Sequence, residues 1–130
     1  LVQRARTYIY DTALPPVCAA AALESLAILR ESPTRPRALA SRVASFRYRA
    51  AVLGIPLSSS TTPIQPIFIG DDARALAVSH RLLADGFYVR AIRPPTVPEG
   101  TARLRITLTH DHSDAHIEQL LTALAGALHK

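Results

Sequence analysis

Two arginines, Arg103 and Arg105, are separated by one residue in a segment where apolar and polar residues alternate. A period of two is typical of a half-buried strand, so residues 102–109 are predicted to form one, with its leucines and isoleucine on the buried face. Both arginines then lie on the opposite face. A guanidinium stays charged and offers a fork of N–H donors that matches a carboxylate. Arg105 is therefore a candidate carboxylate ligand, and an ordinary exposed arginine is the alternative.

The helices and strands around this segment are predicted from the spacing of apolar residues and from the positions of glycine and proline. An alanine- and leucine-rich run after two prolines predicts the first helix, and glycine, proline and aspartate separate the later segments. The predicted order is two helices followed by β-α-β-β-α, which favours an α+β fold with helices on one face of a small sheet. We expect helices at 17–30, 35–53, 73–84 and after Ser113, and strands at 64–69, 87–92 and 102–109.

Several residues have a predicted environment. Pro66 indicates an edge strand or a bulge, because proline cannot donate to a ladder. The helix at 73–84 is expected to turn Leu76 and Leu83 inward, and Ala75 and Leu82 are further candidates for that face. The single cysteine, Cys18, cannot form an internal disulfide and is expected to be a small buried hydrophobe.

Composition limits the function classes. The chain has 130 residues, of which 48% are hydrophobic, enough for one modest core. A net charge of +5 invites nucleic-acid binding, but the arginines are dispersed and aromatic residues make up only 5%, so we set that class aside. The chain begins at Leu1 and shows neither a leader nor a run of about 18 apolar residues. We therefore expect a piece of a cytoplasmic protein with no membrane span.

The histidines and aspartates between residues 110 and 116 invite a metal site. Their spacing is weak support, because His110 and His112 share the end of a strand while His116 opens a helix. Capping or packing is the preferred interpretation, and no metal is expected.

Four segments together resemble the α-oxoamine synthases, which are fold-type I pyridoxal-phosphate (PLP) enzymes. The resemblance covers Arg4 to about Leu128 and implies an α/β parent, of which this chain is the small C-terminal domain (35–130) plus a segment and helix leading from the large domain (1–34). The segments are Leu14-Pro15-Pro16, Ile64-Gln65-Pro66-Ile67, Gly70-Asp71-Asp72-Ala73-Arg74-Ala75-Leu76, and Ala91 to Thr109.

The resemblance also implies site residues. Arg105 matches the arginine that holds the amino-acid carboxylate. Thr96, in a loop stiffened by prolines, matches a substrate contact, and Arg93 is implied to face an anionic part of the acyl substrate. Thr12 matches a hydroxyl that reaches the cofactor phosphate across a homodimer interface, whereas Asp11 departs from the pattern, because a carboxylate repels a phosphate.

The Arg93-Pro94-Pro95 run resembles the biotin-biosynthesis branch of the family. That branch condenses L-alanine with pimeloyl-CoA, or its carrier-protein equivalent, with loss of CO2. Glycine-using members of the 2-amino-3-ketobutyrate CoA ligase and 5-aminolevulinate synthase types are one alternative, and a non-catalytic ligand-binding module is another. The only lysine is Lys130, so the cofactor-anchoring lysine is missing and the chain alone is expected to be inactive.

Overall fold

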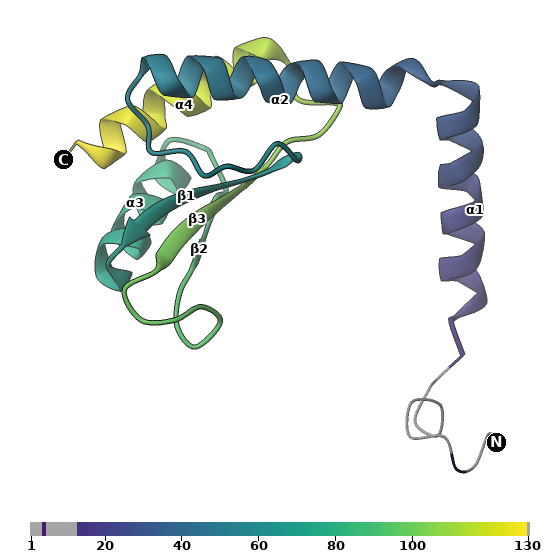
Figure 1. Cartoon of the computed structure of the whole chain (residues 1–130), viewed down its shortest axis with the longest axis horizontal. Helices are drawn as coiled ribbons and strands as arrows, with labels where there is room; N and C mark the ends of the chain where they lie inside the picture. The colour runs from purple at the N-terminus through teal and green to yellow at the C-terminus, as the bar shows by residue number, and fades with distance from the viewer. Residues whose placement is uncertain (1–3, 5–12, 130) are drawn as a thin grey trace. The chain divides into compact units, whose positions relative to one another are not determined.

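The structure, a computed structural model, describes residue 4 and residues 13–129. The chain divides into two compact units, residues 1–34 and 35–130, which are considered separately. Figure 1 shows the elements along the chain. Within the described residues, no helix has the length and apolar character needed to cross a membrane.

The first unit contains helix α1 (Pro16–Glu31). Proline occupies its first position, where a missing N–H costs nothing, and the backbone N–H of Ser32 closes its end on the carbonyl of Ile28 at 3.0 Å. No residue of α1 is buried. The expectation that Cys18 is buried is therefore wrong: its thiol is exposed, since the described residues of the first unit bury no side chain of α1.

The second unit contains a three-stranded sheet. Its strands are β1 (Ile64–Gly70), β2 (Arg90–Ile92) and β3 (Ala102–Thr107), and β3 lies in the middle, antiparallel to both neighbours. β1 is an edge strand, as Pro66 predicted, and its register with β3 shifts between Phe68 and Gly70. The predicted β-α-β-β-α order is confirmed.

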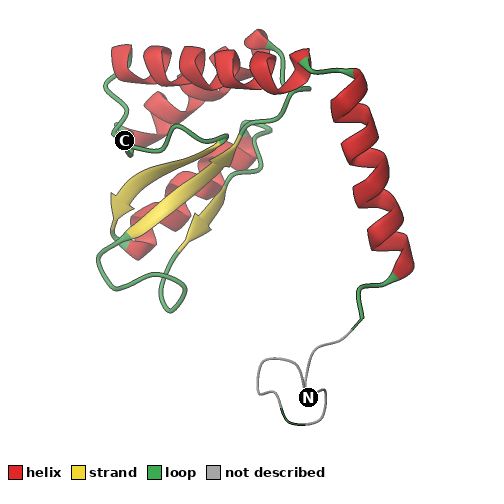
Figure 2. Ribbon diagram, turned by 45° about the vertical axis from the view of Figure 1, so that its right-hand side comes forward, coloured by secondary structure: helices red, strands yellow, loops and turns green. Residues whose placement is uncertain are grey.

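Three helices accompany the sheet: α2 (Thr34–Val52), α3 (Asp72–Ala84) and α4 (Asp114–Leu128). α3 lies against one face of the sheet (Figure 2), and α2 and α4 lie side by side (Figure 1), where the side chains of Arg49 and Glu118 approach to 3.8 Å. The core between these elements is aliphatic apart from one phenylalanine. Its fully buried large side chains include Phe46, Ile67, Leu82, Leu104, Leu121 and Leu124.

The helix starts follow from capping. The carboxylate of Asp71 accepts the backbone N–H of Arg74 at 2.7 Å and begins α3. Ser113 and His116 form a reciprocal capping box at the start of α4, in which the hydroxyl oxygen of Ser113 accepts the N–H of His116 at 3.1 Å. The helix predicted after Ser113 is thus confirmed.

Two local predictions are wrong. The second strand is shorter than residues 87–92, because the N–H of Val89 donates to the carbonyl of Phe87 and its own carbonyl accepts the hydroxyl of Ser79 at 2.6 Å. The single N–H of Val89 is therefore not available to a ladder with β3. On α3, Ala75 and Leu82 are buried as expected, but Leu83 is 54% exposed, and Val78 completes the buried stripe.

A buried polar network joins α2 to the loop before β1. The side chain of Gln65 is fully buried, and its amide nitrogen donates to the carbonyls of Ser60 and Thr62 at 2.9 and 2.6 Å. Its carbonyl accepts Nη1 of Arg47 at 2.9 Å. The same nitrogen of Arg47 donates to the carbonyls of Ser58 and Ser60. The network satisfies the only buried polar side chain among the described residues and fixes where β1 begins.

Candidate functional site

The face of the sheet turned away from α3 carries the predicted carboxylate ligand. Arg105 is the exposed residue of β3 between the buried Leu104 and Ile106, and it lies opposite Pro66 on β1 and Arg90 on β2. Strand geometry alternates side chains between faces, so burial of its two neighbours turns Arg105 outward. The predicted alternation of this strand is confirmed by the structure.

The two arginines of β3 are in different situations. Nε and Nη2 of Arg103 donate to the carbonyl and the hydroxyl of Thr101 at 3.0 and 3.2 Å, and its guanidinium lies 4.5 Å from the ring centroid of Phe68. A cation over a ring face is stabilised by the ring quadrupole. Arg103 therefore has a structural role. Arg105 has no hydrogen-bond or salt-bridge partner among the residues that the structure describes.

Electrostatics set Arg105 apart further. Arg90 lies directly across the strands from it, and like charges in such a pair are destabilising. The salt bridges found in the described part of the chain involve neither residue. An anion bound over this face would relieve the repulsion and use donors that no described residue engages.

The proline-rich loop between β2 and β3 folds as successive turns. The N–H of Thr96 donates to the carbonyl of Arg93 at 3.0 Å, and the N–H and hydroxyl of Thr101 both donate to the carbonyl of Pro98. Gly100 has a φ of +72°, a conformation that favours glycine. The side chains of Thr96 and Arg93 are exposed, and both remain candidate ligand contacts.

Other candidates are not part of this face. Thr12 and Asp11 lie outside the described residues. Nδ1 of His112 accepts the N–H of Thr109 at 3.0 Å, and Nδ1 of His116 belongs to the capping box. Within the described residues no group of three or more histidine, cysteine or acidic side chains is placed to hold a metal ion.

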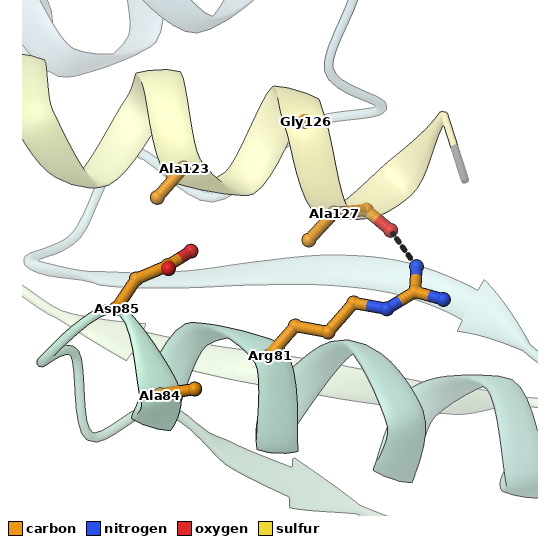
Figure 3. A pocket seen from close by; sticks show the side chains of 6 residues that line it. All are labelled: Arg81, Ala84, Asp85, Ala123, Gly126 and Ala127. Carbon is orange, nitrogen blue, oxygen red and sulfur yellow. Dashed lines mark hydrogen bonds between the residues drawn. The ribbon is translucent and has the colours of Figure 1, made fainter.

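A shallow pocket lies between α3 and α4 (Figure 3). It is a poor candidate for a ligand site, because its lining is mostly alanine and glycine. Its one directed contact is structural: Nη1 of Arg81 donates to the carbonyl of Ala127 at 3.2 Å, near the end of α4. A cation there complements the helix dipole. The pocket therefore joins two helices and offers few groups to a ligand.

The sequence interpretation missed Arg90. Its position is visible only once the register is known, because the short β2 places it opposite Arg105. It also borders a second cavity, of about 270 Å³, beside the edge of β2. No local sequence signal indicates the pairing with Arg105.

Comparison with known proteins gives a consistent picture. The family model of aminotransferase class I and II matches residues 1–124. The chain is 52% identical over 128 residues to 8-amino-7-oxononanoate synthase of Saccharophagus degradans and 55% identical over 128 residues to that of Methylococcus capsulatus. Each alignment covers 98% of this chain, and the chain spans about a third of the length of these curated relatives (32% and 33%).

Two solved structures share the fold. Serine palmitoyltransferase from S. paucimobilis, with PLP and myriocin bound, superposes with a TM-score of 0.81 at 28% identity, over 94% of this chain and 31% of that one. The structure of 8-amino-7-oxononanoate synthase from Francisella tularensis gives 0.75 at 28% identity, over 96% and 36%. These likenesses confirm the fold-type I relationship expected from the sequence.

Proposed function

Because this chain belongs to the aminotransferase class I and II family, we propose that the protein is a PLP-dependent 8-amino-7-oxononanoate synthase. It joins L-alanine to pimeloyl-CoA or pimeloyl-carrier protein, with loss of CO2, in biotin biosynthesis. The observation that carries the proposal is the guanidinium of Arg105, which has no partner among residues 13–129, on a strand whose other arginine is internally bonded. The identity of 52–55% to synthases of that name supports it.

Arg105 is proposed to bind the carboxylate of L-alanine. Its side chain extends from the central strand, which the core holds through Leu104 and Ile106, so its position is well defined. A bidentate pair with a carboxylate sets orientation as well as charge. Holding the carboxylate in one plane aligns the bond that breaks when CO2 leaves.

The proline-rich loop is proposed to form part of the acyl site. Its successive turns limit its freedom, so less entropy is lost when a ligand is held. Thr96 offers an exposed hydroxyl, and Arg93 offers a charged group suited to an anionic part of the acyl donor. Arg105 and this loop would then bind the two substrates separately.

The described residues fit only part of a PLP site. When bound, PLP withdraws electrons from the α-carbon of an amino acid. The described residues include no lysine to anchor its aldehyde, and the one matching hydroxyl, on Thr12, lies outside the described part. What they do supply is a cationic surface for the substrate carboxylate. We therefore propose that these 130 residues alone are inactive, and that the protein works as a homodimer in the cytoplasm.

The substrate assignment is tested by thiol release from pimeloyl-CoA in the presence of PLP. The full-length protein is assayed with either L-alanine or glycine as the amino-acid substrate. Turnover with L-alanine and little with glycine supports the proposal. Turnover with glycine and another acyl-CoA places the protein with the glycine-using synthases, and no turnover with any pair favours a non-catalytic ligand-binding module.

A further inference from the structure

The pairing of β2 with β3 places a second arginine beside the proposed carboxylate ligand. Arg90 lies directly opposite Arg105. The next residue of β2, Ala91, lies opposite the buried Leu104 and packs against the core. Because successive side chains of a strand alternate between faces, Arg90 points away from the core, to the same face as Arg105. Both arginines are exposed.

The described residues do not balance the charge on this face. None of the three strands contains an acidic residue. On the other side of Arg105, the paired residue is Pro66, whose side chain carries no charge. The salt bridges and side-chain hydrogen bonds found within residues 13–129 involve neither Arg90 nor Arg105. Two like charges therefore remain side by side, which costs the free protein stability.

The two guanidinium groups can reach one anion. Directly opposed residues of an antiparallel pair have Cβ atoms about 4.5–5.5 Å apart. An extended arginine side chain is longer than this separation, so both can converge on a group that lies over the sheet between them. A carboxylate has about four lone-pair sites for hydrogen bonds. A bidentate pair with Arg105 therefore leaves acceptor sites for Arg90.

We propose that Arg90 is a second ligand of the substrate carboxylate and tightens the binding of L-alanine. The inference rests on the proposed function, in which Arg105 binds the same carboxylate. Arg105 extends from the central strand and fixes the orientation of that group, whereas Arg90, on the short edge strand β2, adds charge and hydrogen bonds. The bound anion also screens the two arginines from each other, which accounts for a pair that otherwise only destabilises the sheet.

The kinetic test measures KM for L-alanine by thiol release from pimeloyl-CoA, using the full-length protein with saturating PLP at low ionic strength. We expect Arg90→Gln to raise this KM about fivefold, the effect of losing one solvent-exposed ion pair, and to leave KM for pimeloyl-CoA unchanged. Arg90→Lys keeps the charge but not the fork of donors, and should raise KM for L-alanine only about twofold. Arg37→Gln removes the same charge from an exposed position on α2 and should behave as wild type.

A stability measurement separates this role from a structural one. Removing one of two opposed like charges should leave the melting temperature of the full-length protein unchanged or raise it. Arg90→Gln is thus expected to lose affinity for L-alanine without losing stability. A lower melting temperature in Arg90→Gln than in Arg37→Gln would mean that Arg90 supports the fold, and would overturn the proposal.

The kinetic outcomes distinguish this inference from the proposed function. A wild-type KM for L-alanine in Arg90→Gln, alongside a raised KM in Arg105→Gln, refutes the role of Arg90 and leaves the synthase assignment intact. Equal increases in KM for L-alanine and for pimeloyl-CoA in Arg90→Gln refute it as well, because the carboxylate contact concerns only the amino acid. Absence of any turnover with L-alanine refutes the proposed function and this inference with it.

Discussion

The buried amide of Gln65 offers the sharpest test of how the fold positions β1. Gln65→Leu keeps the volume of the side chain but removes its hydrogen bonds to Ser60, Thr62 and Arg47, whose lengths are 2.6–2.9 Å. Each such bond contributes about 1 kcal/mol net, and each group left unpaired in the interior costs more. We therefore expect the free energy of unfolding to fall by about 3 kcal/mol.

The free energy of unfolding is measured by urea denaturation. We expect a lower urea concentration at the midpoint of unfolding and an unchanged dependence of the free energy on urea. Gln119→Leu makes the same substitution on the exposed side of α4 and should change stability by less than about 0.5 kcal/mol. The double variant Arg47→Leu, Gln65→Leu should lose less than the sum of the two single losses, because both side chains serve one network. A loss in Gln65→Leu no larger than that in Gln119→Leu would refute the reasoning.

Two further predictions concern the core and a helix cap. Leu104→Ala removes a fully buried side chain from the central strand and should cost about 3 kcal/mol, whereas Leu83→Ala, at a site that is 54% exposed, should cost less than about 1 kcal/mol in the same denaturation experiment. Similar losses would mean that the assigned packing of α3 is wrong. Ser113→Ala removes the acceptor for the N–H of His116 and should cost about 1 kcal/mol, measured against Ser32→Ala beyond the end of α1. No difference between the two variants would show that the cap is not stabilising.

Local patterns predicted much of the second unit. Alternation in β3 places Leu104 inside and Arg105 outside, because successive side chains of a strand point to opposite faces. Proline at position 66 predicted an edge strand, since it lacks a donor. These features depend on residues close together in the chain, which is why sequence alone predicts them.

Features that depend on distant residues were not predictable in this way. The partners of Gln65 include Arg47, which is 18 residues away, and nothing local indicates that they meet. The strand containing Arg90 is shortened in part by Ser79 on α3, whose hydroxyl donates to the carbonyl of Val89. Burial of Cys18 failed for a related reason: an apolar helix indicates that a partner surface is needed but does not supply one.

The two arginines of β3, Arg103 and Arg105, look alike in the sequence but differ in the structure. The sequence places both on one face of a strand and distinguishes them only through a family resemblance. The structure separates them physically, because Arg103 is engaged by Thr101 and Phe68 while Arg105 is free of partners among the described residues. The pairing of β2 with β3 also places Arg90 opposite Arg105, and no local sequence pattern indicates this.

The most direct test of the central claim is KM for L-alanine in Arg105→Gln and in Arg103→Gln, measured by thiol release from pimeloyl-CoA with PLP saturating. Losing a charged pair with the substrate carboxylate costs at least about 1.5 kcal/mol, so Arg105→Gln should raise this KM tenfold or more. Arg103→Gln, which loses only internal contacts, should raise it less than about threefold. A wild-type KM in Arg105→Gln, or equal increases in the two variants, would contradict the assignment of Arg105 as the carboxylate ligand.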